Sequence, residues 1–329
     1  MIEVSHLHKT FRVARRNAGI GEAVRALFRR EYTEIHALDD ISFRIADGEM
    51  VGYIGPNGAG KSSSIKVMSG ILTPDSGSCV IDGCVPWRDR RAHVANIGVV
   101  FGQRSQLWWD VPVIDSFDLI RDIYRVAEHQ YHTDLDELCD LLDLGEILRT
   151  PTRQLSLGQR MRCEIAASLI HRPRILFLDE PTIGLDAVSK LAVREFIRRI
   201  NRERGTTVIL TTHDMQDIEA LTERIILIGR GKILLDGALD ALKAKHSALR
   251  RITVRFAPGT PSPAARPLPD GITLLSADEG RAEFGVDTAR LSVSAAIECL
   301  TRDIDVRDLA VTGQSTEELV VSLYEEFRI

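Results

Sequence analysis

Near residue 55 the chain passes from a short apolar strand into a glycine-rich loop and then directly into a helix. Val51 to Ile54 forms the strand, the loop reads GPNGAGKS, and Ser63 to Ser69 continues with helical spacing. The loop fits the phosphate-binding pattern G-x-x-x-x-G-K-[ST], whose glycines let the backbone close around phosphate oxygens. A helix N-terminus adds N–H groups and a dipole that favour an anion. The three parts in this order favour a phosphate-binding α/β fold over a chance glycine turn.

The same pattern assigns roles within the loop. Lys61 is expected to reach the β- and γ-phosphates of a nucleotide, Ser62 to bind Mg²⁺, and Ser63 to donate to the phosphate nearest the nucleoside. The predicted phosphate-binding residues are Gly55, Pro56, Asn57, Gly58, Ala59, Gly60, Lys61, Ser62 and Ser63.

The rest of the first 240 or so residues alternates short β-branched runs with longer helical stretches, as in a sheet connected by crossover helices. Besides Val51 to Ile54, the strand candidates are Ile97 to Phe101, Ile175 to Leu178 and Thr207 to Thr211. Each is followed by polar or glycine residues, where an open α/β sheet places its ligands. Between Val113 and Leu148 the strand signal disappears and apolar residues recur at three- and four-residue steps, which predicts a helical insertion.

The composition changes at residues 258–269, where five prolines exclude regular structure. On either side, Arg251 to Phe256 and Ala282 to Val286 have strand patterns, and Ser315 with Glu318 is the pattern of a capping box for a last helix. We therefore predict a P-loop α/β domain over residues 1–245, with a mixed sheet and a helical subdomain at about 103–171. A small C-terminal α+β domain is predicted over residues 246–329.

Composition and charge narrow the class of protein. The 329 residues are 44% hydrophobic and 27% charged, with a formal net charge of -5, so the totals predict no broad basic surface for nucleic acid. No apolar run approaches the roughly 20 residues of a transmembrane helix, and the N-terminus lacks a signal-peptide pattern, so we expect a cytoplasmic protein. The cysteines have neither zinc nor disulfide spacing and are interpreted as reduced packing residues: Cys79, Cys84, Cys139, Cys163 and Cys299.

A second polar group follows the strand Ile175 to Leu178, in the segment ILFLDEPTIGLD. Asp179 is placed to coordinate Mg²⁺ directly or indirectly, and Glu180 to orient and deprotonate an attacking water. Two adjacent acids also occur at solvated strand ends, but that interpretation leaves the Pro181 turn and the segment Gly184 to Asp186 unexplained.

A third segment, LSLGQR at residues 155–160, precedes a helical pattern. Ser156 is expected to cap this helix, and Gly158 leaves the backbone open, so that the helix start can bind an anion. Taken alone, the segment is only a helix cap.

Over about residues 1–240 the chain resembles the ATP-binding cassette ATPases. The resemblance rests on a set of motifs in a fixed order: GPNGAGKS, Gln103, LSLGQR, ILFLDE, Gly184 to Asp186 and His213. The resemblance implies that ATP and Mg²⁺ are bound between two cassettes arranged head to tail. One cassette contributes the P-loop (GPNGAGKS) and the other contributes the signature segment (LSLGQR). It implies that Ser156, Gly158 and Gln159 contact the γ-phosphate of the partner's ATP. It also implies that Gln103 senses Mg²⁺ and the attacking water, and that His213 contacts the γ-phosphate, although a lone histidine at a strand end is often incidental.

Two features depart from the usual pattern of that family. Leu157 replaces the first glycine of L-S-G-G-Q, a change that bears on how tightly the sandwich closes. Residues 12–35 form an insertion where family members have a short turn. An aromatic residue from this region normally stacks on adenine, and Phe11 is the best match, followed by Tyr32. Residues 20–28 have an apolar helical face, which fits either a helix near anionic lipid or a permease, or a helix packed on the cassette.

The stretches GQRSQLWWD and LSLGQRMRCE resemble the ATPase subunits of bacterial drug and antibiotic exporters whose membrane subunits are separate chains. Trp108 and Trp109 lie where that family faces the permease, although core packing also explains them. The resemblance implies a homodimer or paired cassette bound to integral membrane permeases, on the inner face of the cell membrane. The alternative is a soluble cassette protein acting on ribosomes or nucleic acid. A small-molecule P-loop kinase has no need of LSLGQR.

Overall fold

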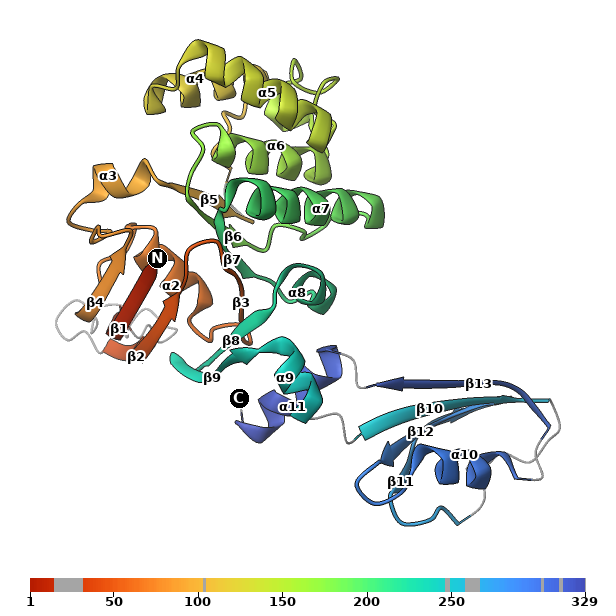
Figure 1. Ribbon diagram of the computed structural model, residues 1–329. Helices are drawn as coiled ribbons and strands as arrows, with labels where there is room; N and C mark the ends of the chain where they lie inside the picture. Colours follow the sequence, from red (N-terminus) through yellow and green to blue (C-terminus); the bar gives the residue numbers. More distant parts are fainter. Residues whose placement is uncertain are drawn as a thin grey trace, which may run out of the picture. The chain divides into compact units, whose positions relative to one another are not determined.

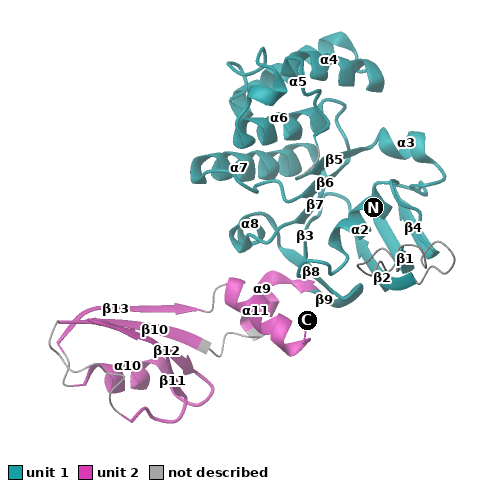
Figure 2. Ribbon diagram, turned by 180° about the vertical axis from the view of Figure 1, so that it is seen from behind, with its two compact units in different colours: residues 1–236, 329 teal, residues 237–328 magenta. Residues whose placement is uncertain are grey.

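The computed structural model (Figure 1) describes residues 1–14, 32–102, 105–245, 249–257, 267–302, 305–313 and 316–328. They form two compact units, Met1–Asp236 and Gly237–Arg328 (Figure 2). This division and the boundary that we predict after residue 245 differ by one short helix, α9 (Leu239–Lys245). The predicted helix at residues 20–28 lies outside the described residues.

The first unit contains a small antiparallel sheet that the sequence patterns do not separate from the main one. In spatial order its strands are β2 (Tyr32–Ile45), β1 (Ile2–Ala14) and β4 (Ser76–Ile81). Alternating residues of β1 and β2, such as Ile2, Val4, Phe43 and Ile45, are buried, as expected for strands with one face on the core. This sheet places the first half of β2 beside the P-loop, where the Ala37 carbonyl faces Gly60.

The main sheet has six strands. In spatial order they are β5 (Ile97–Phe101), β6 (Ile175–Asp179), β7 (Thr207–Thr211), β3 (Met50–Ile54), β8 (Arg224–Gly229) and β9 (Lys232–Ala238). The pairs from β5 to β8 are parallel, so their carboxyl ends share one edge. The four predicted strands are confirmed, and the order places β3 in the interior of the sheet beside β7. The α/β fold class is therefore confirmed.

Some helices lie beside this sheet, and others form a separate stack at one end of the unit (Figure 1). The stack contains α4 (Val113–Tyr124), α5 (Glu128–Leu142), α6 (Leu157–Leu169) and α7 (Ala187–Arg204). The predicted helical insertion is confirmed: Val113, Phe117 and Ile120 in α4 are buried at helical spacing, as are Leu135, Leu138 and Leu142 in α5. The described residues of the unit also form α2 (Lys61–Met68), α3 (Arg90–Val94) and α8 (Met215–Leu221), with a 3₁₀ turn at Thr152–Gln154.

The second unit is an antiparallel sheet with helices. Its strands, in spatial order, are β11 (Ile272–Asp278), β12 (Arg281–Asp287), β10 (Leu249–Phe256) and β13 (Val306–Gly313). The helix α10 (Val293–Thr301) contributes Ala296 and Leu300 to a core with Val254 and Phe284. A last helix, α11, spans Thr316–Glu326, and its predicted cap Ser315 lies outside the described residues. The two strands predicted in this region are confirmed.

Across the described ranges, no helix has both the length and the apolar character that a bilayer crossing requires.

Candidate functional site

A cavity of about 610 Å³ lies at the edge of the main sheet where its parallel strands end. It brings together segments that are far apart in the sequence: the P-loop, the ends of β5 and β6, the second residue after β7, and the first half of β2. The residues that line it are Ile35, Ala37, Pro56, Asn57, Gly58, Ala59, Gly60, Lys61, Ser62, Ser63, Lys66, Ile71, Phe101, Gly102, Asp179, Glu180, Ile183 and His213.

The P-loop has the backbone geometry that its glycines predict. Gly58 and Gly60 have φ angles of +80° and +116°, which side-chain-bearing residues rarely adopt. A Cβ at Gly60 would lie 2.5 Å from the Ala37 carbonyl oxygen, so the loop also needs glycine there for space. The Ser64 amide donates to the Gly60 carbonyl over 2.9 Å, which joins the loop to α2. The structure thus forms a rigid cradle that opens into the cavity.

Lys61 lies folded over this cradle. Its ammonium donates to the carbonyl oxygens of Gly55 and Pro56, the second over 3.1 Å. Burial lowers the pKa of Lys61, although the nearby carboxylates of Glu180 and Asp179 oppose that effect. A partly desolvated cation at the mouth of a backbone cradle is suited to phosphate oxygens.

Oxygen atoms suited to Mg²⁺ lie next to the P-loop. The Ser62 hydroxyl donates to Asp179 Oδ2 over 3.4 Å, and the Thr211 hydroxyl donates to Asp179 Oδ1. Asp179 is held in place because Phe101, Asp179 and Thr211 are register partners across three adjacent strands. A hydroxyl and a carboxylate are hard oxygen donors of the kind that Mg²⁺ prefers, and these two fit the ion.

Glu180 and His213 form a carboxylate–imidazole pair in the cavity. His213 Nδ1 lies 2.5 Å from Glu180 Oε2, and the Glu180 amide donates to the Thr211 carbonyl over 2.9 Å. Glu180 has a φ of +59°, a left-handed conformation that costs a non-glycine residue about 1–3 kcal/mol and is concentrated at functional sites. The turn that follows β6 therefore turns the carboxylate toward the histidine at the end of β7. The sequence predicted both residues, and the structure brings them together.

A buried carboxylate behind this pair escaped the sequence analysis. Asp217 is 0% exposed; its Oδ2 accepts from the hydroxyls of Thr182 and Thr212, the latter over 3.3 Å. Its Oδ1 accepts from Arg194 Nε over 2.6 Å. Asp217 thus holds the turn after Glu180 and the end of β7 that precedes His213. Its position in the first turn of α8 did not indicate a buried role. An acidic residue there is usually exposed to solvent and interacts favourably with the helix dipole.

The predicted helix cap at the signature segment is confirmed. The Gln159 amide donates to Ser156 Oγ over 3.2 Å, and the Ser156 amide donates to Gln159 Oε1 over 2.9 Å, which is a complete capping box. Among the described residues, those that line the nucleotide-sized cavity include none from Ser156 to Gln159. One subunit therefore carries the P-loop cavity and the signature helix start as separate surfaces.

The structure does not describe one predicted site residue and places a second outside the lining of this cavity. Gln103 lies outside the described residues, although the next positions, Ser105 and Gln106, are held by the buried Glu164 of α6. Phe11 does not line the cavity, whereas Ile35, its register partner on β2, does. The adenine-stacking role of Phe11 stays a prediction.

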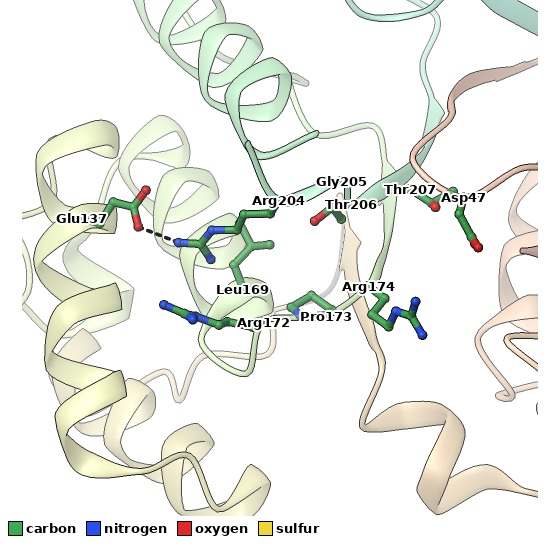
Figure 3. A pocket seen from close by; sticks show the side chains of 10 residues that line it. All are labelled: Asp47, Glu137, Leu169, Arg172, Pro173, Arg174, Arg204, Gly205, Thr206 and Thr207. Atoms are coloured by element: carbon green, nitrogen blue, oxygen red, sulfur yellow. Dashed lines mark hydrogen bonds and ion pairs between the residues drawn. The ribbon is translucent and has the colours of Figure 1, made fainter. Parts of the chain in front are cut away.

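A second cavity in the same unit, of about 500 Å³, is rich in arginine but is not a comparable candidate (Figure 3). Arg204 lies 2.6 Å from Glu137, and Arg172 makes a bidentate contact with the buried Asp134. Figure 3 shows the Arg174 side chain directed away from these two. Because the guanidinium groups of Arg172 and Arg204 are already paired with Asp134 and Glu137, this cavity lacks the converging reactive groups of the first one.

Comparison with known proteins points to one family. Residues 38–183 match the model of the family described as ABC transporter. The daunorubicin resistance ATP-binding protein DrrA3 of Streptomyces coeruleorubidus is 31% identical over 296 residues, which cover 89% of this chain and 93% of that protein. The methionine import ATP-binding protein MetN of Geobacillus kaustophilus is 31% identical over 239 residues, covering 71% and 69%.

The similarity extends to solved structures. The ATP-binding cassette MJ0796, solved as a dimer in a post-hydrolysis state bound to ADP and phosphate, matches with a TM-score of 0.61 and 25% identity. The match covers 73% of this chain and 99% of that one.

Proposed function

The chain belongs to the ATP-binding cassette family of ABC transporters, as an ATP-binding and ATP-hydrolysing subunit that uses Mg²⁺, and we propose that it powers an exporter as one half of a head-to-tail pair of cassettes. In this proposal each ATP lies between the P-loop of one subunit and the signature segment of the other. The pair binds integral membrane permeases at the cytoplasmic face of the cell membrane.

One observation carries the proposal of a shared site. The 610 Å³ cavity contains the P-loop, both acids and His213, whereas Ser156 to Gln159 present a capped helix start elsewhere on the subunit. A helix N-terminus binds anions through its free N–H groups and its dipole. In the proposal, the signature helix start of one subunit therefore completes the phosphate site of the other.

Each residue of the cavity has a defined task in hydrolysis. The P-loop amides and Lys61 hold the phosphates, and Ser62 with Asp179 would hold Mg²⁺, which supplies positive charge to the phosphate oxygens. Glu180 orients the attacking water and takes its proton. His213 Nδ1 lies 2.5 Å from Glu180 Oε2, which fixes the direction of that carboxylate, and in the proposal the imidazole also contacts the γ-phosphate.

Two features support a permease partner and export. Trp108 and Trp109 are 59% and 51% exposed, and exposed tryptophans are enriched at protein interfaces. The similarity to DrrA3, which is named as a daunorubicin resistance ATP-binding protein, covers 89% of the chain, and expelling a drug is one way for a cell to resist it. MetN is named as an import protein, and its similarity covers a smaller share of the chain.

A mixing experiment tests the shared site. In the proposal, Glu180→Gln subunits lack the base and Ser156→Arg subunits lack a usable signature, so each purified variant alone is inactive. A mixed dimer has one complete site, formed by the cavity of the Ser156→Arg subunit and the signature of the Glu180→Gln subunit. An equal mixture should therefore recover about one quarter of the wild-type ATPase rate, since about half of the dimers are mixed and each has one of two sites intact.

The control is an equal mixture of Glu180→Gln with a Glu180→Gln/Ser156→Arg double variant, which contains no functional base and should remain inactive. If the first mixture is as inactive as this control, the shared site is wrong.

For the direction of transport, inside-out membrane vesicles that contain the protein and its co-purifying permeases should accumulate daunorubicin when ATP is added. ATP-driven loss of daunorubicin from these vesicles would contradict export.

A further inference from the structure

The leucine that interrupts the signature segment packs against a glycine that follows the catalytic strand. An ideal Cβ built on Gly184 would lie 2.2 Å from Leu157 Cδ2 and 3.4 Å from Leu157 Cγ. Real Cβ atoms do not approach another carbon so closely, so the Leu157 side chain occupies the space that a side chain at position 184 would need. Gly184 has a φ of +71°, so glycine is favoured there by conformation as well as by space.

The neighbouring positions reinforce this contact. A Cβ at Gly158 would lie 3.5 Å from Leu185 Cδ2 and 3.8 Å from Ser189 Oγ, so the backbone of the signature segment runs along residues 185–189. Leu185 is 8% exposed, and Asp186 caps α7 by accepting from the Ser189 amide over 2.8 Å. The start of α6 and the start of α7 are thus in direct contact through Leu157, Gly158, Gly184 and Leu185.

The same segment is fixed to the catalytic pair. Thr182 donates to the buried Asp217, which also accepts from Thr212, the residue before His213. A continuous set of contacts therefore runs from Glu180 and His213 through Thr182 to Gly184, and from Gly184 to Leu157 beside the Ser156 cap. Asp217 joins its Thr182 and Thr212 parts, and Leu157 lies at the end beside the signature segment.

We propose that Leu157 is a positioning residue that sets the signature helix start in register with the Gly184 to Asp186 segment. The proposal rests on the shared site proposed above. Because Leu157 fills the space over Gly184, the Ser156 hydroxyl and the amides of the helix start are presented to the partner's nucleotide at a fixed distance from this subunit's own Glu180 turn. A glycine at position 157 leaves that space empty and lets the two segments shift independently.

A reciprocal substitution tests the steric fit. Gly184→Ala forces the tip of Leu157, whose side chain is 40% exposed, away from position 184. The ATPase rate should fall, by up to about a hundredfold if the signature segment moves by about 1 Å with it. Adding Leu157→Gly to Gly184→Ala removes the clash and should recover most of the rate. Leu157→Gly alone should weaken ATP-dependent dimerisation of a Glu180→Gln background, whereas Leu157→Met, which fills the space, should preserve it.

Three controls separate this effect from a general loss of structure. Gly83→Ala adds a methyl group at a similar φ of +77° with no atom within 4 Å, so it should leave the ATPase rate unchanged. Binding of mant-ATP to the subunit's own P-loop should be equal in the Leu157→Gly protein and the wild type. In a mixture with Glu180→Gln, the Leu157→Gly subunit should enter ATP-dependent mixed dimers more readily than it dimerises with itself, because the Glu180→Gln subunit supplies an intact signature.

The outcomes distinguish the two proposals. If Leu157→Gly fails to rescue Gly184→Ala, or if Leu157→Gly dimerises as well as the wild type, Leu157 does not position the signature segment. If the Ser156→Arg and Glu180→Gln mixture is also inactive, the shared site itself is wrong.

Discussion

Replacement of Asp217 by alanine should destabilise the first unit more than any surface charge change on the same helices. The carboxylate is fully buried and accepts from Arg194 Nε at 2.6 Å and from the hydroxyls of Thr182 and Thr212. Its loss leaves an 11% exposed guanidinium without its closest counter-charge and two buried hydroxyls without an acceptor. Removing one partner of a buried ion pair costs about 3–5 kcal/mol.

That cost converts into a measurable shift. For a unit of this size, 1 kcal/mol corresponds to about 2–4 °C in melting temperature, so Asp217→Ala should lower the melting temperature by about 10 °C. Differential scanning calorimetry measures it, and the transition of the first unit is the one that ATP and Mg²⁺ raise. The ATPase rate should fall as well, because the Thr182 and Thr212 contacts fix the turns that carry Glu180 and His213.

The matched control lies on α7, as Arg194 does. Glu203 pairs with Arg199 over 3.0 Å, but both side chains are at least 40% exposed, and such pairs contribute less than about 1 kcal/mol. Glu203→Ala should therefore shift the melting temperature by no more than about 4 °C. An Asp217→Ala shift as small as this would refute the reasoning, because it would mean that Arg194 finds other solvation at no cost.

Two further results are expected. Lys61→Met should abolish stabilisation by ATP. It should also raise the melting temperature of the nucleotide-free protein at pH 7, because burial lowers the pKa of Lys61 and so penalises its charged form in the folded state. The difference should shrink as pH rises from the lowered folded pKa to the ordinary value of 10.5, and a pH-independent difference would contradict this cause. In thiol labelling followed by mass spectrometry, Cys84 and Cys299 should react before Cys79 and Cys163, whose burial raises the pKa of each thiol to about 12. Faster labelling of Cys163 than of Cys299 would show that the middle of α6 opens readily.

The parts of the site that the sequence predicted are those built from contiguous residues. The P-loop, the end of β6 and the cap at Ser156 each combine a local backbone conformation with a side chain a few positions away, so spacing alone identifies them. The four strands behind them were predictable because each is a β-branched apolar run followed by a polar residue. The helical insertion followed from its three- and four-residue period.

The parts that could not be predicted depend on residues distant in the chain. Asp217 meets Thr182 and Arg194 only after α7, α8 and the end of β7 have packed, and no local pattern separates it from a solvated acid. The small antiparallel sheet was hidden because its strands β1 and β2 enclose a long insertion, and because β1 pairs with β4, which follows the P-loop in the sequence. The fit of Leu157 over Gly184 is likewise a property of packing, although each residue alone was recognised in the sequence.

The three strands that carry the catalytic groups are of equal length, and this limits where the chain can tolerate insertions. β5, β6 and β7 each have five residues, and Phe101, Asp179 and Thr211 are aligned at their ends. One extra residue within β6 would turn Asp179 to the opposite face of the sheet and separate it from both Ser62 and Thr211. Length variation among related chains should therefore gather in the connections at the amino ends of these strands, where an added residue leaves the alignment of the carboxylates intact.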